Sequence, residues 1–386
     1  MLRKIMSVFL IISLLGCSVV AVKAVDASSE NAQAEALISA PSGVLMEAST
    51  GKILYEKNPH EKRPCASITK VMTLLLVFEA MDSGKLALDD MITASEHAAS
   101  MGGSDIWLEP GETMSADDMI KATVVASAND AAVALAEQIC GSEDEFVRQM
   151  NERAARLGMG DTVFKNCNGL DEDGHITSAY DVALMSRELM KHKKVFDYTS
   201  IWLDTLRGGE TQIVNTNKLL KSYKGITGLK TGTTDDAGCC ISATATRDGM
   251  SLIGVVLGAD TGKQRFADAA ALLDYGFANY AIKELKAPED LPDSVKVNGG
   301  MEQSAALKCD VNGNLVVNKA SADEPDISVS VPEELDAPVL EGEKVGAVTY
   351  TIGGDSKTFD VISGTEIAET SFGRVFGRLF DSLVKM

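Results

Sequence analysis

The chain has 386 residues, which is enough for two domains with a sizeable core. Its apolar content of 45% and its charged content of 24% are those of a globular protein. The formal net charge of −20 argues against nucleic acid as a partner, because phosphate binding needs clustered lysines and arginines.

The N-terminus has the pattern of an export signal. Two basic residues precede an apolar run from Ile5 to Val22, and small residues follow it, so we expect residues 1–24 to be a signal peptide. An uncleaved anchor helix is the alternative, and the stretch ending at Cys17 also resembles, imperfectly, a lipoprotein signal. Residues 25–39 are polar and are expected to be a linker. Each alternative places the body of the protein outside the cytoplasmic membrane.

The first expected elements of the body lead to a serine and a lysine. A hairpin is expected from two short strands at 43–48 and 52–56, and a helix from Ser67 to about Asp82. Ser67 and Lys70 would share one face of that helix. A serine becomes a useful nucleophile when a neighbouring neutral amine takes its proton, so the pKa of Lys70 should lie far below 10.4 through burial or a second cation. Alone, Ser-x-x-Lys is common and is equally typical of a helix cap with a surface lysine.

Helices dominate the middle of the chain, and strands return after it. An apolar run at 119–125 ends at Ser127-Ala128-Asn129, and a glycine- and threonine-rich stretch at 225–234 precedes a hairpin. Strands at both ends of residues 40–280 predict one sheet of early and late strands with helices packed on it. Helices are expected at 131–139, 145–157, 179–190 and 266–280, and strands at 239–246 and 251–257.

The composition changes from about Ala287. Prolines punctuate short alternating runs, which predict a small all-β domain at 283–364, interpreted as a stalk or spacer. In residues 365–386, apolar side chains follow the i, i+3, i+4, i+7 pattern with basic residues between them. This pattern favours a helix lying in a membrane interface, and docking on the β domain is the alternative.

The cysteines are scattered in apolar surroundings, without a Cys-x-x-Cys pair or a His/Cys cluster. We therefore expect no metal site and no cofactor, and mostly free thiols, although an exported location permits a disulfide. The seven are Cys17, Cys65, Cys140, Cys167, Cys239, Cys240 and Cys309.

Three short motifs follow one another along the chain: Ser67-x-x-Lys70, Ser127-Ala128-Asn129 and Lys230-Thr231-Gly232. This trio is typical of penicillin-binding proteins and class A β-lactamases. With the stretches at 103–112, 215–220 and 272–277, residues from roughly 36 to 280 resemble D-alanyl-D-alanine carboxypeptidases, the low-molecular-mass penicillin-binding proteins of the penicillin-binding protein 5 type.

The resemblance implies a fold and an activity. The fold would be α/β (α+β): a β-lactamase/transpeptidase-like domain at 40–282 with a mainly antiparallel sheet covered by helices, then the small all-β domain and the terminal amphipathic helix. The activity would be removal of the terminal D-alanine from peptidoglycan stem peptides through an acyl-enzyme on Ser67. Penicillins and other β-lactams would inhibit it covalently. The protein would work at the outer face of the bacterial cytoplasmic membrane, in the cell wall, with the C-terminal helix on the membrane surface.

The resemblance also implies residue roles. Ser67 would be the nucleophile, Lys70 the general base and Ser127 the proton relay to the leaving D-alanine. The backbone N–H groups of Ser67 and Thr233 would form the oxyanion hole. The substrate would be bound by Asn129, by Lys230, by the strand edge at Thr231 and Gly232, and by Arg265, which could instead be a helix surface charge.

Other activities stay open at this point. A class A β-lactamase would carry a Glu-x-x-Leu-Asn segment, and residues 164–170 contain no such glutamate. A D,D-endopeptidase or a transpeptidase differs only in the acyl acceptor, which the sequence does not reveal. A non-catalytic wall-binding homologue is disfavoured because all three motifs are intact.

Overall fold

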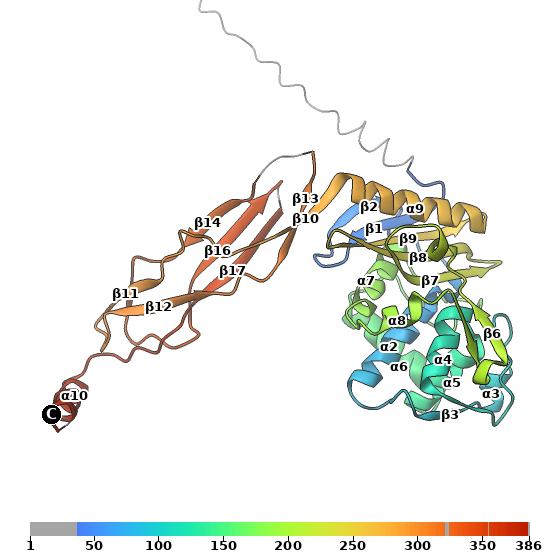
Figure 1. The fold of residues 1–386 in the computed structure, drawn as a ribbon, viewed down its shortest axis with the longest axis horizontal. Coiled ribbons are helices and arrows are strands. Elements are labelled where there is room, and N and C mark those ends of the chain that lie inside the picture. The colour runs from blue at the N-terminus through green and yellow to red at the C-terminus, as the bar shows by residue number, and fades with distance from the viewer. Residues whose placement is uncertain (1–36, 321–323, 354, 385–386) are drawn as a thin grey trace, which may run out of the picture.

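The computed structural model describes residues 37–320, 324–353 and 355–384. At its centre is a five-stranded antiparallel sheet with the strand order β2-β1-β9-β8-β7 (Figure 1). Because β1 pairs with both β2 and β9, the prediction of one sheet from early and late strands is confirmed. The strands are β1 Ser42–Glu47, β2 Ile53–Lys57, β7 Ile226–Thr234, β8 Gly238–Arg247 and β9 Met250–Ala259.

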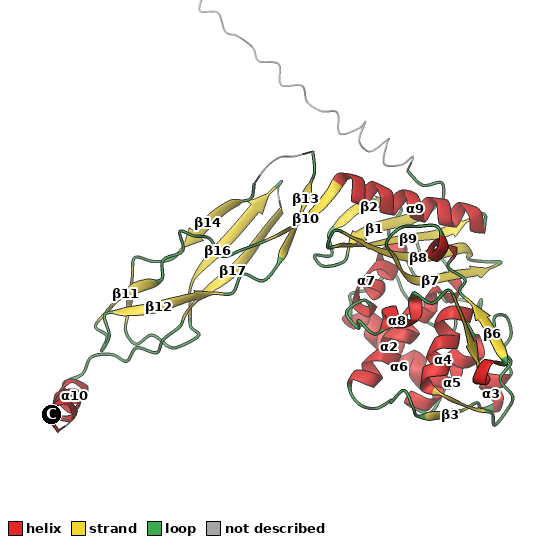
Figure 2. Cartoon of the chain, viewed as in Figure 1, coloured by secondary structure: helices red, strands yellow, loops and turns green. Residues whose placement is uncertain are grey.

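Helices cover both faces of this sheet. The long helix α9 lies on one face, and α2 and α4 to α8 form a layer on the other (Figure 2). Alternate residues of β9 point to opposite faces, so Ile253 and Val255 pack in one apolar core while Leu252 and Val256 pack in the other. The helices are α2 Lys70–Asp82, α3 Glu96–Ala99, α4 Ala116–Lys121, α5 Asn129–Cys140, α6 Glu143–Arg156, α7 Ala179–Leu189, α8 Val195–Thr199 and α9 Gly262–Asn279.

The helix expected from Ser67 is present, with a difference at its start. Residues Ala66–Thr69 form a 3₁₀ turn, and the α-helix α2 continues it from Lys70. The turn is entered through a left-handed Ala66, with φ of 51°. Two short antiparallel strand pairs accompany the helical layer: β3 Met91–Thr93 with β4 Thr113–Ser115, and β5 Leu203–Leu206 with β6 Thr211–Val214.

The C-terminal part is built of strands, as the sequence predicts. It has a two-stranded sheet, β10 with β13, and a six-stranded sheet in the order β14-β16-β17-β12-β11-β15. The expected boundary between residues 282 and 283 falls within β10. These strands are β10 Tyr280–Glu284, β11 Ser294–Asn298, β12 Ser304–Cys309, β13 Asn314–Asn318, β14 Asp326–Ser330, β15 Glu334–Asp336, β16 Lys344–Ile352 and β17 Asp355–Ser363.

The chain ends in helix α10, Phe372–Val384, at the far end of the β region (Figure 1). None of its residues is buried, and its large apolar side chains from Phe372 to Val384 are all exposed. Among the described residues, no helix has both the length and the apolar character needed to cross a membrane. The expected signal peptide and Cys17 lie outside the described residues.

Candidate active site

Ser67 and Lys70 lie together at the junction of the 3₁₀ turn and α2. The Lys70 ammonium nitrogen is 3.1 Å from Ser67 Oγ and is completely buried between α2, α5 and the loop after α6. Burial lowers the pKa of Lys70 to about 7. The pKa of Lys70 thus lies far below 10.4, as a general base beside Ser67 requires, and burial is the main cause.

The other partners of Lys70 orient its nitrogen. Lys70 Nζ donates to Asn129 Oδ1 at 2.5 Å and to the carbonyl oxygen of Asn168 at 2.6 Å. The orientation of the Asn129 amide is fixed, because its Nδ2 donates to the carbonyl oxygen of Gly102. Two pure acceptors thus occupy the two N–H groups of a neutral amine. Its lone pair is left for the Ser67 hydroxyl, which is the arrangement that a general base needs.

A second lysine lies on the opposite side of the site. Lys230, on β7, donates to Ser127 Oγ at 2.7 Å and is 1% exposed. Burial first, and then the charges of Lys70 and Arg265, lower the pKa of Lys230 well below its usual value. Ser127 has a left-handed backbone, with φ of 62°, at the end of a π-helical turn (Ala122–Ala126). The site therefore contains two serine–lysine pairs, Ser67 with Lys70 and Ser127 with Lys230.

Strand β7 forms one wall beside the nucleophile. A side-chain carbon added at Gly232 would lie 2.7 Å from the carbonyl oxygen of Cys65 and 2.9 Å from the backbone nitrogen of Ser67. Only glycine permits so close an approach. Thr231 is buried and donates its hydroxyl to Thr216, whereas Thr233 is exposed at the strand end. The wall thus presents an accessible strand end next to Ser67.

Arg265, near the start of α9, is buried rather than a helix surface charge. It is 8% exposed, and its Nη1 donates to the carbonyl oxygens of Gly232 and Cys240 and to the Thr233 hydroxyl. Its guanidinium lies 4.7 Å from the centre of the Phe266 ring. Arg265 therefore fixes the end of β7 and brings positive charge to it.

Two residues of the site were missed by the sequence reasoning. The carbonyl group of Asn168 binds Lys70, and Gly169 follows it with φ of 90°. A side-chain carbon at Gly169 would lie 2.0 Å from the carbonyl oxygen of Ala66, inside any permitted contact. The Asn-Gly pair is a local turn signal, but no local signal shows that this loop packs against the nucleophile.

Behind the nucleophile lies a buried polar chain. The backbone N–H of Lys165 donates to His175 Nδ1, so Nε2 carries the proton and donates to Thr69 Oγ1 at 2.7 Å. Thr69 in turn lies 3.4 Å from Cys65 Sγ. Burial lowers the pKa of His175 to about 4 and raises that of Cys65 to about 11. Both groups are neutral at pH 7, which makes Cys65 a poor nucleophile, and its free, buried thiol agrees with the expectation for the cysteines.

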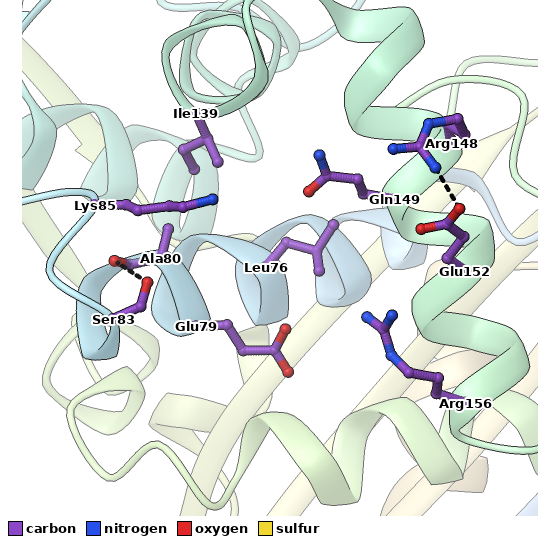
Figure 3. A pocket seen from close by; sticks show the side chains of 10 residues that line it. All are labelled: Leu76, Glu79, Ala80, Ser83, Lys85, Ile139, Arg148, Gln149, Glu152 and Arg156. Atoms are coloured by element: carbon purple, nitrogen blue, oxygen red, sulfur yellow. Dashed lines mark hydrogen bonds and ion pairs between the residues drawn. The ribbon is translucent and has the colours of Figure 1, made fainter.

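A separate depression of about 340 Å³ lies among side chains of α2, α5 and α6 such as Leu76, Ile139 and Gln149 (Figure 3). No predicted site residue lines it. Among residues 37–320, 324–353 and 355–384, no group of acidic, histidine or cysteine side chains is placed to hold a metal ion. The six cysteines in these ranges are all unpaired.

Comparison with known proteins identifies the arrangement. The sequence model of "D-alanyl-D-alanine carboxypeptidase" matches residues 28–261, and that of "Penicillin-binding protein 5, C-terminal domain" matches residues 280–369. The chain is 42% identical over 321 residues to D-alanyl-D-alanine carboxypeptidase DacF of Bacillus subtilis, which covers 82% of each chain.

Solved structures agree. Penicillin-binding protein 5 from Haemophilus influenzae superposes with a TM-score of 0.77 at 30% identity, over 86% of this chain and 98% of that one. Penicillin-binding protein D2 from Listeria monocytogenes, in its ampicillin-bound form, gives 0.57 at 36% identity over 62% of this chain and 98% of that one. The expected fold and the expected family are thereby confirmed. The chain belongs to the D-alanyl-D-alanine carboxypeptidase family, whose members are serine enzymes of the penicillin-binding protein 5 type.

Proposed function

We propose that Ser67 attacks the carbonyl carbon between the two terminal D-alanines of a peptidoglycan stem peptide, with neutral Lys70 as the general base. The observation that carries this assignment is the set of three contacts at Lys70 Nζ, two of which are to pure acceptors. Attack moves the Ser67 proton to Lys70 and places negative charge on the carbonyl oxygen. The backbone N–H groups of Ser67 and Thr233 stabilise that oxygen.

The proton then travels to the leaving group. Ser127, which lies 2.7 Å from Lys230 Nζ, relays it to the nitrogen of the departing D-alanine. Asn129 binds the amide of the substrate while it orients Lys70. Water next hydrolyses the ester on Ser67, so that the shortened peptide leaves and the enzyme is restored.

The terminal carboxylate of the substrate pairs with positive charge at the end of β7. Lys230 and Arg265 supply this charge, and the hydroxyl of Thr233 and the edge formed by Thr231 and Gly232 add neutral contacts. Since an anion favours the charged form of a nearby amine, binding of the substrate raises the pKa of Lys230. β-Lactams present a carboxylate and a strained amide to the same groups, and acylate Ser67.

The deciding experiment is release of free D-alanine from a peptide ending in D-Ala-D-Ala, with the protein and its Ser67→Ala variant. We expect release and covalent labelling by penicillin with Ser67 present, and neither with alanine there. Labelling that survives the substitution would refute Ser67 as the nucleophile. Labelling without D-alanine release would turn the assignment toward a transpeptidase or endopeptidase.

The location proposed for this enzyme is the outer face of the cytoplasmic membrane. Residues 1–24 export the chain, and residues 365–386 hold it at the membrane surface. The support for the second point is helix α10, where Phe376, Leu379 and Phe380 are each more than half exposed. The peptidase domain at 40–282 would then be carried away from the membrane by the β domain at 283–364.

A further inference from the structure

An exposed aromatic side chain lies three residues beyond Ser104, whose carbonyl oxygen accepts the backbone N–H of Asn129. Trp107 is 80% exposed, and its φ of 55° is an outlier for so bulky a residue. It lies in the segment between α3 and β4, where its neighbours Ile106 and Leu108 are buried. The backbone therefore turns the indole out while the residues on either side enter the core.

Buried charges hold this backbone in place. The carboxylate of Asp130, 1% exposed, accepts the N–H groups of Ile106 and Leu108. Arg207 donates to the carbonyl oxygens of Ile106 and Trp107. Since Asp130 directly follows Asn129 of the active site, one structural unit fixes both the catalytic amide and the outward indole.

The indole lines an open groove of about 650 Å³ between two chain segments, one from Ile106 to Glu112 and one from Arg207 to Gln212. The first segment can be followed back to Gly103. A side-chain carbon added at Gly103 would lie 3.0 Å from Asn129 Nδ2. The second continues along β6 to Thr216, which accepts the hydroxyl of Thr231. Because each segment is linked in this way to an active-site residue, a peptide with its D-Ala-D-Ala end at Ser67 would follow the two segments to reach the groove.

The charges around the groove determine which charge on a ligand Trp107 can bind. Among the described residues that line it, Arg207 is the only cation, and Glu112 neutralises it by accepting its guanidinium at 2.7 Å and 3.1 Å. Two exposed carboxylates, Glu109 and Glu210, remain on the lining. An aromatic face next to uncompensated carboxylates attracts a cation and repels an anion.

We propose that Trp107, with Glu109 and Glu210, binds an ammonium group on a substrate side chain upstream of D-Ala-D-Ala, and so sets the substrate preference. The inference rests on the proposed function, because it extends the same peptide from Ser67. The ligand chemistry is a primary amine on a flexible aliphatic side chain that can reach over the indole.

The test compares two peptides that differ in one charge. Both are Nα-acetyl-L-Lys-D-Ala-D-Ala, and in one of them the lysine side chain is also acetylated. With the full chain we expect kcat/KM to be about 5- to 10-fold higher for the free amine, the size of a cation–π contact with one supporting carboxylate. The preference should fall with added salt.

Three variants separate the proposal from its rivals. Trp107→Ala should bring the ratio of the two kcat/KM values close to 1, Trp107→Phe should keep most of it, and Glu210→Gln should lower it. An unchanged ratio in Trp107→Ala would overturn the inference. So would a Trp107→Ala variant that loses kcat/KM for a muramyl peptide alone, since the indole would then hold a sugar.

A binding measurement keeps the two proposals distinguishable. The concentration of each peptide that halves the rate of penicillin labelling at Ser67 reports binding without hydrolysis. If neither peptide is cleaved, the proposed function fails, and the ratio of these two concentrations decides the inference by itself. Equal protection by both peptides would refute it.

Discussion

The buried Lys70 should cost the folded protein stability, and removal of its charge should reveal the cost. Its pKa falls from 10.5 to about 7 on folding. The unfolded chain therefore binds more protons than the folded chain between these values, so the penalty is absent above pH 10.5, grows as the pH falls and levels off below about 7. At about 1.4 kcal/mol for each pKa unit, it reaches about 4 kcal/mol at pH 7 and about 2 kcal/mol at pH 9.

Lys70→Met keeps an unbranched apolar side chain and removes the terminal amine. The variant loses the hydrogen bonds to Asn129 and Asn168, at about 1 kcal/mol each or somewhat more because both acceptors stay buried. At pH 7 we therefore expect a variant that has lost acylation and is nevertheless as stable as the parent, or more stable by about 1 to 2 kcal/mol.

The decisive quantity is the change of this difference with pH. Between pH 7 and pH 9 the titration of Lys70 itself should stabilise the parent by about 2 kcal/mol relative to Lys70→Met. Loss of the Lys70 charge also lets the pKa of Lys230 rise in the variant. Denaturant unfolding followed by tryptophan fluorescence measures the difference in stability, because both tryptophans of the chain, Trp107 and Trp202, lie in segments that connect elements of the helical part. The exposed Lys62→Met is the matched control. Parallel stability curves of parent and Lys70→Met would refute the depressed pKa.

Three further outcomes are expected. The rate constant of acylation should rise with pH with a midpoint near 7, because only neutral Lys70 accepts the Ser67 proton; a rate independent of pH from about 6 to 8 in stopped-flow labelling would contradict this. Gly169→Ala should lose penicillin labelling or fail to fold, whereas Gly158→Ala, with φ of 76° and open space around it, should label normally at a cost of about 1 kcal/mol; equal labelling would count against the packing of the 169 loop. Deletion of residues 370–386 should abolish sedimentation with anionic vesicles without a change in kcat/KM; a truncated protein that still sediments would assign the attachment to another part of the chain.

The sequence alone predicted the fold and the reactive groups, because periodicities within short segments and the order of motifs along the chain indicate them. Alternating and helical periodicities predicted the hairpin of β1 and β2, the helix after Ser67 and the strands beyond residue 287. The order of the three motifs pointed to the family, and the requirement for a neutral amine beside Ser67 pointed to a Lys70 that is either buried or close to a second cation.

Only the tertiary structure decided how these groups meet. The carbonyl group of Asn168 and the space left by Gly169 become part of the site because a distant loop packs on the 3₁₀ turn, and no periodicity encodes that contact. The same holds for Arg265, which in sequence could be a surface charge on α9 and in the fold is buried against the end of β7. Residue types and spacing thus determined which chemistry is available, whereas the close packing of loops and strands determined the protonation states and the directions of the groups that perform it.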